Sequence, residues 1–216
     1  MGDLYGDKKG LLVVISGPSG TGKGTVCQEY LNRHPETLMS VSMTTRQPRK
    51  GEEDRVDYFF TDKTTFEEMI EEGGFLEYAK VYDNYYGTPK SFVKENLLNG
   101  RDIILEIDIQ GALQIKEKFD EGVFIFIVPP TMEELKRRIK GRGTETTESL
   151  LKRFSGAYKE LNFITRYNYI VINDKIEDAA SKIQSIILAE KCRVDRNKGF
   201  YTKLQGGMND DLSDFG

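Results

Sequence analysis

Four apolar runs of strand length are spaced along the chain. They cover residues 11–15, 103–107, 123–128 and 169–172, and only Glu106 interrupts them. Apolar runs of this length, without strict alternation, are typical of strands that are buried on both faces of a parallel sheet. We therefore expect four core strands.

Helical patterns separate the apolar runs. A glycine-rich stretch at 17–24 opens the first pattern, and a second covers 110–118. Thr131, with Glu134 three residues later, predicts the capping box of another helix. Apolar positions at three- and four-residue spacing after Asp174 predict an amphipathic helix. Strands that alternate with helices predict an α/β fold with a parallel sheet and right-handed crossovers.

Residues 40–88 break this alternation. They are rich in Thr, Tyr, Arg and Glu, and they contain short apolar segments such as 58–60. Thr64, with Glu67 three residues later, predicts the start of a helix that ends near Gly73. We interpret this stretch as a mixed α+β subdomain inserted into the core.

The remaining boundaries follow from two further polar stretches. Residues 141–157 are dense in Thr, Glu and Arg beside glycines, which is typical of a mobile lid. The glycines and acidic residues of 198–216 predict a flexible tail. The core is thus expected to comprise 1–39 and 89–197, with the lid inside the second segment.

Composition is that of an ordinary folded protein. The 216 residues are 38% hydrophobic and 31% charged, with a mean hydropathy of −0.50. No apolar run approaches the ~18 residues of a membrane span. The first residues are charged and lack the apolar segment of a signal peptide, so we expect a cytoplasmic protein without membrane partners.

Charge and rare residues exclude several classes of function. A net charge of −4 and a pI of 5.3 argue against a nucleic-acid partner, because such proteins are usually basic. His34 is the only histidine, which excludes multi-histidine zinc sites and disfavours a Ser–His hydrolase. It precedes Pro35, so a turn at a helix end is expected. Cys27 and Cys192 lack metal-ligand spacing and are expected to be buried or inert.

The strongest chemical signal lies between the first strand and the first helix. The motif consists of Gly17, Pro18, Ser19, Gly20, Thr21, Gly22, Lys23, Gly24 and Thr25. A strand that ends in Gly-x-x-x-x-Gly-Lys and opens a helix is a P-loop, whose N–H groups surround the β-phosphate while Lys23 neutralises β- and γ-oxygens. The motif therefore predicts a nucleoside triphosphate site.

One position departs from the common P-loop pattern. Gly24 stands where many P-loops carry the Ser or Thr hydroxyl that binds magnesium. Either Thr25 compensates, or water and phosphate oxygens hold the ion, which suits the reluctance of Mg²⁺ to lose its water. We expect Mg²⁺ as the cofactor but predict no direct protein ligand.

The P-loop does not show which molecule, if any, accepts a phosphoryl group from the triphosphate, so that acceptor must be identified from other segments. A switch GTPase would carry Asp-x-x-Gly, which residues 108–111 match, and Asn-Lys-x-Asp, which is absent because 173–175 have the wrong order. A GTPase is therefore disfavoured.

The segment around residues 42–52 offers phosphate-binding groups. Arg46 and Arg49, separated by a proline turn, can form a fork on a phosphate, with hydroxyls from Tyr58 and Tyr86. Taken alone, the same residues are equally explained by a solvated basic turn and two surface aromatics.

Six ordered motifs resemble the guanylate kinase family over residues 10–195. They lie at 16–23, 42–49, 83–88, 105–111, 141–145 and 171–174. The resemblance implies a parallel-sheet P-loop kinase core with an inserted α+β NMP-binding subdomain and a mobile lid. It implies transfer of a phosphoryl group from ATP to GMP, with dGMP as a second acceptor, by a monomer or a homodimer.

The resemblance also assigns roles to individual residues. The GMP phosphate is expected to bind Arg46, Arg49, Tyr58 and Tyr86, and the guanine to bind Ser42, Glu77, Thr88 and Glu106. Arg138, Arg142 and Arg153 are expected to close onto the triphosphate, and Asn173 to lie near the adenine. With Lys23 and Arg46, those three arginines form the expected catalytic set.

The chemistry of guanine agrees with these roles. A carboxylate at Glu77 can accept from N1–H and the 2-amino group, while hydroxyls on Ser42 and Thr88 can donate to O6. Adenine lacks N1–H and has a donor at position 6, so discrimination can reach ~10⁴. By itself, Glu77 is also explained as the solvent side of a strand. Glu106 stands where some members carry Asp, which leaves its contact with the base less defined.

Asp108 ends an apolar run at the carboxyl edge of the predicted sheet, where ligands bind in open α/β folds. Two interpretations stay open for it: it holds Mg²⁺ or an acceptor-side group, or it caps the following helix.

Phosphoryl transfer to an ionised phosphate requires positioning and positive charge rather than a strong base, which agrees with the single histidine. Singly, Arg138 and Arg153 are also explained as helix-surface charges. Two other classes stay open: a kinase with another small acceptor, and a non-catalytic scaffold, which the presence of Lys23 disfavours.

Overall fold

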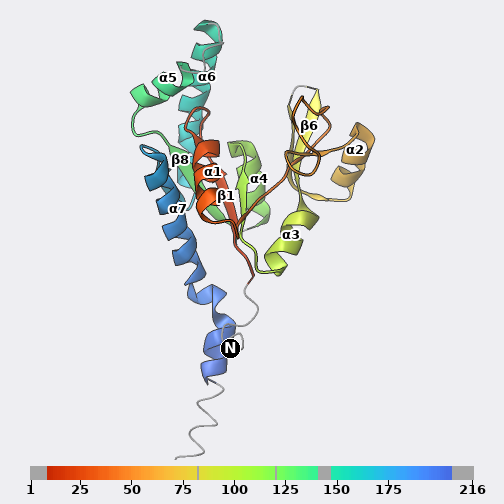
Figure 1. Ribbon diagram of the computed structural model, residues 1–216, viewed down its shortest axis with the longest axis vertical. Helices are drawn as coiled ribbons and strands as arrows, with labels where there is room; N and C mark the ends of the chain where they lie inside the picture. The colour runs from red at the N-terminus through yellow and green to blue at the C-terminus, as the bar shows by residue number, and fades with distance from the viewer. Residues whose placement is uncertain (1–8, 82, 120, 141–146, 206–216) are drawn as a thin grey trace, which may run out of the picture.

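The structure, a computed structural model, describes residues 9–81, 83–119, 121–140 and 147–205. A central sheet carries helices on both faces, a smaller lobe that contains β6 and α2 lies to one side, and α5 and α6 lie to the other (Figure 1). The central sheet is parallel throughout and has the strand order β2-β7-β1-β8-β9. Its strands are β1 (Leu12–Ser16), β2 (Leu38–Met39), β7 (Ile103–Glu106), β8 (Val123–Val128) and β9 (Tyr169–Ile172).

The four predicted core strands are confirmed, and β2 is an addition. It has two residues and pairs with Ile103 and Ile104 of β7 at the edge of the sheet. A strand this short has no apolar run, so the hydrophobic pattern did not reveal it.

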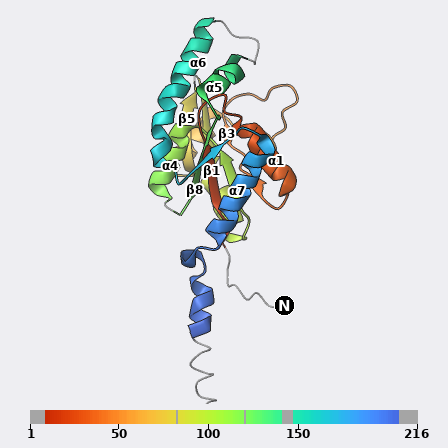
Figure 2. The ribbon, with the colours of Figure 1, turned by 90° about the vertical axis from the view of Figure 1, so that its left-hand side faces the viewer.

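Alternate residues of β1 pack against opposite helix layers. Val13 and Ile15 lie in one apolar cluster with residues of α1 and α7, whereas Leu12 and Val14 lie in a second cluster with residues of α3 and α4. Figure 2 shows α1 and α7 on the same face of the sheet. These helices are α1 (Lys23–Arg33), α3 (Lys90–Leu98), α4 (Ile109–Lys118) and α7 (Ile176–Lys191). The helix pattern is thus confirmed, and His34 ends α1 as expected.

The inserted stretch forms a second, mixed sheet of strand order β4-β3-β6-β5. Its elements are β3 (Met43–Thr44), β4 (Phe59–Phe60), α2 (Lys63–Glu71), β5 (Phe75–Val81) and β6 (Asn84–Pro89). Phe66 of α2 is fully buried and stacks on Phe75 and Tyr85, with ring centroids 4.3 and 5.3 Å away. This aromatic cluster joins α2 to the sheet.

The predicted start of α2 at Thr64 is wrong by two residues. The helix is capped by Asp62, whose carboxylate accepts from the Thr65 N–H at 2.9 Å and from its hydroxyl at 2.8 Å. A carboxylate satisfies the free N–H groups at a helix start as well as a hydroxyl does, so Asp62 takes the capping position and Thr64 lies inside the helix.

The segment expected to be a mobile lid contains helical structure. Beyond α5 (Met132–Lys140), the chain forms α6 (Thr147–Glu160) and the 3₁₀ helix η1 (Leu161–Arg166). Leu135 and Ile139 of α5 pack against Ala157 of α6, so the two helices form one unit. Residues 141–146 lie outside the described residues.

The helix start at Thr131 is confirmed, but the capping box is half formed. The Thr131 hydroxyl accepts from the Glu134 N–H at 3.1 Å. The Glu134 carboxylate turns instead to Arg137 and Arg138, at 2.7 and 2.6 Å, because two guanidinium groups are stronger partners than one backbone N–H.

The first part of the segment expected to be a flexible tail is helical. After η2 (Val194–Arg196), residues 198–205 are helical, and most of them are exposed; residues 206–216 lie outside the description. Cys27 is buried in the core as expected, whereas Cys192, at the end of α7, is exposed. None of the described helices is long and apolar enough to cross a membrane.

Candidate active site

The P-loop connects β1 to α1, as the motif predicts. Gly17, Gly20 and Gly22 have φ angles of 146°, 89° and 83°, which are unfavourable for other residues. A Cβ on Gly17 would lie 2.2 Å from the Ile127 carbonyl oxygen, and one on Gly22 would lie 2.6 Å from the Asn173 amide nitrogen. Close packing against β8 and the residue after β9 thus requires glycine at both places.

Lys23 lies at the start of α1 with its amine folded over the loop. It donates to the carbonyl oxygens of Gly17 and Pro18, at 2.6 and 3.2 Å. Burial lowers the pKa of this amine, and the negative charges of Glu106, Glu160 and Asp108 oppose that shift. These contacts hold a cation at the mouth of the loop, where phosphate oxygens can replace the carbonyls.

The structure explains the glycine at position 24. A Cβ on Gly24 would lie 3.3 Å from both carboxylate oxygens of Glu106. The side chain of Glu106 therefore fills the space that a Ser or Thr would occupy, and it faces the P-loop. Thr25, one residue later, lines a cavity on the other side of the loop.

A second cluster of polar groups lies in the inserted subdomain. The Arg46 guanidinium binds both carboxylate oxygens of Glu52, at 2.9 and 3.0 Å. It lies over the Tyr58 ring at 5.4 Å, and the rings of Tyr58 and Tyr86 pack edge to face with centroids 6.1 Å apart. The structure therefore brings Arg46, Tyr58 and Tyr86 together, while the side chain of Arg49 is exposed beside them. We call Arg46, Arg49, Tyr58 and Tyr86 the arginine–tyrosine cluster.

Glu77 and Thr88 form a buried pair between the subdomain and the core. The Thr88 hydroxyl donates to the Glu77 carboxylate at 2.6 Å, and the two side chains are 0% and 7% exposed, respectively. Burial raises the pKa of Glu77. A Cβ on Gly111, in the first turn of α4, would lie 2.9 Å from the other Glu77 oxygen, so the carboxylate packs on this helix start. Ser42 lies in the same subdomain and is half-buried.

Asp108 caps α4. Its carboxylate accepts from the Gly111 N–H at 2.8 Å, which is the capping interpretation of the two left open. The Asp-x-x-Gly match of residues 108–111 is thereby explained by the geometry of a helix start.

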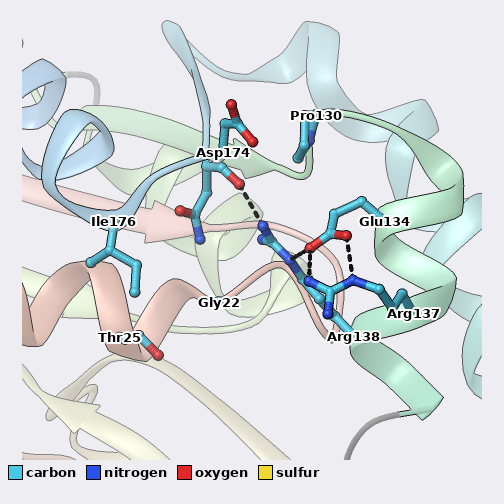
Figure 3. Close-up of a pocket in the computed structure, with 9 residues that line it drawn as sticks. Gly22, Thr25, Pro130, Glu134, Arg137, Arg138, Asp174 and Ile176 are labelled. Carbon is cyan, nitrogen blue, oxygen red and sulfur yellow. Dashed lines mark hydrogen bonds and ion pairs between the residues drawn. The ribbon is translucent and has the colours of Figure 1, made fainter.

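A cavity of about 500 Å³ lies beside the P-loop (Figure 3). Its lining residues are Gly22, Thr25, Pro130, Glu134, Arg137, Arg138, Asn173, Asp174 and Ile176. Arg138 crosses it, donating to the carbonyl oxygens of Thr21 and Asn173 at 3.3 and 3.0 Å. The Asn173 amide donates to Thr21 O at 2.8 Å, and its buried side-chain oxygen has no hydrogen-bond partner among the described residues.

Two other arginines were expected near the triphosphate. Arg153 of α6 donates to the Ser19 hydroxyl of the P-loop at 3.0 Å. Arg142 lies outside the described residues. The structure thus brings Arg138 and Arg153, from the two helices of the α5–α6 unit, to Thr21 and Ser19 of the P-loop.

Comparison with known proteins decides the family. A family model described as guanylate kinase matches residues 9–190. The chain belongs to the guanylate kinase family.

Guanylate kinases of other organisms match nearly the whole chain. That of Caldanaerobacter subterraneus subsp. tengcongensis is 61% identical over 198 residues, which are 92% of this chain and 96% of that protein. That of Clostridium tetani is 66% identical over 191 residues, 88% and 91% of the two chains. The crystal structure of guanylate kinase from Anaplasma phagocytophilum is 33% identical, has a TM-score of 0.75 and covers 94% of this chain and 97% of that chain. The resemblance and the α/β fold predicted from sequence are confirmed.

Several side chains that lie in this site were not identified as site residues from the sequence. Glu52 binds Arg46, Glu134 holds Arg138, and Glu160 lies close enough to Lys23 to influence its pKa. Each is a glutamate in a polar stretch, where a solvated charge is the ordinary expectation. A signal was present for Glu134 alone, as the second half of a capping box. The carboxylate of Glu106 lies beside Gly24 of the P-loop, and its contact with guanine stays a prediction.

Proposed function

We propose that this chain transfers the γ-phosphoryl group of ATP to GMP, giving ADP and GDP, and that dGMP is a second acceptor. The observation that carries the choice of acceptor is the buried Glu77–Thr88 pair. A buried carboxylate and hydroxyl match the donors of guanine and its O6 acceptor, and adenine would leave them unpaired, which is costly.

The arginine–tyrosine cluster is proposed to hold the phosphate of GMP. Arg46 supplies a planar set of donors, Arg49 adds a second exposed cation, and Tyr58 and Tyr86 add hydroxyls. An arginine is suited to this task because its N–H groups match two phosphate oxygens at once. Ser42, in the same subdomain, is proposed to donate a hydrogen bond from its hydroxyl to O6 of guanine.

Lys23 and the arginines of the α5–α6 unit are proposed to surround the transferred group. Lys23 would exchange the carbonyls of Gly17 and Pro18 for β- and γ-oxygens. Arg138 and Arg153 would add charge from the other side, with Arg142 as a third cation. Because the acceptor is already an ionised phosphate, catalysis requires alignment and charge neutralisation, and an arginine in this role can contribute ~10³-fold or more in rate.

The adenine of ATP is proposed to occupy the cavity beside Asn173. The unpartnered side-chain oxygen of Asn173 is a suitable acceptor for an amino group at that depth.

Mg²⁺ is proposed as the cofactor, held with the nucleotide. Phosphate oxygens and water are proposed to hold the ion, which suits the reluctance of Mg²⁺ to lose its water. Glu106 lies against Gly24 and can accept hydrogen bonds from such water molecules. When bound, such an ion would neutralise negative charge on the phosphates.

An acceptor panel tests the proposal. ADP release from ATP is measured with GMP, dGMP, AMP, CMP and UMP; we expect turnover with GMP and dGMP and less than 1% of it with the others. Lys23→Ala should abolish transfer while GMP binding persists. Equal turnover with AMP, or normal turnover by Lys23→Ala, contradicts the proposal.

A further inference from the structure

Glu52 occupies an unusual place for an acidic residue. Its carboxylate lies inside the arginine–tyrosine cluster that is proposed to bind a phosphate dianion. Both of its oxygens contact Arg46, one accepting from Nη1 at 3.0 Å and the other from Nη2 at 2.9 Å. The two side chains are only 14% and 20% exposed. An acid here lowers the positive charge available to the ligand, so its presence needs an explanation other than charge.

Glu52 is itself firmly held. The Glu52 oxygen that binds Nη1 also accepts from the Arg49 N–H at 2.7 Å, and the Glu52 N–H donates to the Arg49 carbonyl at 3.1 Å. Hydrogen bonds to Arg46 and to the Arg49 backbone lower the pKa of this carboxyl, so it is ionised at neutral pH. One carboxylate therefore fixes both the guanidinium of Arg46 and the backbone of Arg49.

The remaining contacts define which edge of Arg46 can meet a ligand. Nη1 also donates to the Gln47 carbonyl at 2.8 Å. The rings of Tyr58 and Phe60 lie 5.4 and 5.9 Å from the guanidinium carbon. The Nη1–Nη2 end is thus used within the protein. The edge that includes Nε is the one from which two parallel hydrogen bonds to a phosphate can be made.

We infer that Glu52 is a positioning residue for the acceptor phosphate: it binds the far end of Arg46 and so presents the Nε edge to GMP. The inference rests on the proposed function, because it takes Arg46 as a phosphate ligand. A flexible arginine would lose rotational freedom on binding, and a partner that restricts it beforehand reduces that loss. Glu52 thereby improves affinity although it carries the same sign of charge as the ligand.

The alternative is that Glu52 competes with the phosphate and leaves when GMP arrives. The two ideas predict opposite signs for one variant. Removing the charge with Glu52→Gln weakens GMP binding if Glu52 positions Arg46, and strengthens it if Glu52 competes.

The experiment compares GMP with guanosine, which has the same base and no phosphate. Dissociation constants of GMP and guanosine are measured calorimetrically for wild type and Glu52→Gln. KM values for GMP and for ATP are measured on the same two proteins. We expect GMP affinity to fall 10- to 100-fold, guanosine affinity to change less than twofold, and KM for ATP to stay constant. Glu29→Gln is the matched control, because Glu29 pairs with Arg33 at 2.7 Å on α1; it should change neither affinity.

Each other outcome is decisive. Equal losses for GMP and guanosine would show that Glu52 only maintains the loop, and tighter GMP binding would show competition; both overturn the inference. If Glu52→Gln does not fold, Glu52→Asp gives the same comparison, with a smaller selective loss expected because a carboxylate is retained. Arg46→Ala separates the two proposals. If it leaves the ratio of GMP to guanosine affinity unchanged, the proposed role of Arg46 fails; if it lowers the ratio and Glu52→Gln does not, only the present inference fails.

Discussion

Glu77 combines burial with a single hydroxyl partner among the described residues. Its carboxylate is 7% exposed and accepts from Thr88. A buried acceptor that finds no donor on the ligand costs free energy, so the pair discriminates between bases more strongly than it binds either one. Selectivity is thus expected to be the property most sensitive to this residue.

Glu77→Gln should reduce kcat/KM for GMP by about 100-fold or more, because the amide replaces an acceptor with a donor that faces the donors of guanine. The acceptor panel measures the ratio of GMP to AMP turnover, and an unchanged ratio would refute the role. Stability is the control. Since burial raises the pKa of Glu77 in the folded chain, its ionised form destabilises the fold once the pH exceeds that pKa. The variant should therefore unfold at pH 8 at no lower a temperature than wild type.

The raised pKa of Glu77 also predicts how guanine binding depends on pH. A raised pKa means that Glu77 takes up a proton at a higher pH than an exposed glutamate, and the protonated carboxyl has lost acceptor capacity. Guanosine affinity should consequently fall as the pH decreases through the range in which Glu77 takes up its proton, which lies above that of an exposed glutamate, and this dependence should vanish in Glu77→Gln. Guanosine is used in a calorimetric titration because it has no phosphate that titrates in this range. A pH-independent affinity in wild type would be inconsistent with an ionised Glu77 at the base.

Single residues were predictable from the sequence where a motif fixes backbone and side chain together. The glycines and Lys23 of the P-loop lie where the motif places them. Glu52 was not predictable, since its partner Arg46 is expected to bind a ligand and the turn appears basic and solvated. The position of Glu106 depends on the missing side chain of Gly24, a three-dimensional match that spacing along the chain does not encode.

Helix α2 shows how capping choices are made at the level of an element. The sequence pattern predicts Thr64 as the cap, whereas in the structure Asp62 caps the helix with two hydrogen bonds to Thr65. The helix carries Phe66, the centre of the aromatic cluster of the subdomain. Its start therefore affects the stability of the small sheet.

Asp62→Ala should lower the free energy of unfolding by about 1 kcal/mol, the usual cost of losing an N-cap. Urea denaturation followed by circular dichroism provides the measurement. Thr64→Ala is the matched control and should cost less than about 0.5 kcal/mol. Equal losses of unfolding free energy in the two variants would contradict Asp62 as the sole cap of α2.

Strands of the core were predictable because each carries a visible apolar run. The core strands β1, β7, β8 and β9 have four to six residues, enough for an apolar run to be visible. Strands β2, β3 and β4 have two residues each and depend on neighbours distant in sequence. Helix α6 begins in a polar stretch rich in Thr and Glu, so its helical pattern was hidden behind the composition of a loop.

The molecule as a whole is two lobes and a helical unit joined at the proposed substrate sites. The inserted subdomain reaches the core through Glu77, which packs on the first turn of α4, and through Gln114 of α4, which bonds the backbone of Tyr78 in β5 at 3.3 and 3.4 Å. The α5–α6 unit reaches the P-loop through Arg138 and Arg153. Ligands placed at these joints should stabilise the entire fold.

GMP alone or ADP alone, at about 100 times its dissociation constant, should raise the free energy of unfolding by about 2.7 kcal/mol. For a chain of this size that corresponds to a rise in Tm of roughly 5–10 °C. Differential scanning fluorimetry provides the measurement. Lys23→Ala should keep the response to GMP and lose most of the response to ADP; loss of both responses would place Lys23 in the fold rather than in the donor site.

The unequal burial of the two cysteines has a practical consequence. Cys27 is 0% exposed, and burial raises its thiol pKa, whereas Cys192 is exposed at the end of α7. That end of α7 lies by the start of β7, where Lys191 pairs with Asp102, and the P-loop is at the opposite edge of the sheet (Figure 1). A maleimide dye should thus attach at one place in the unmodified chain. The protein therefore provides its own spectroscopic handle, remote from the nucleotide sites, for following lobe movements by fluorescence.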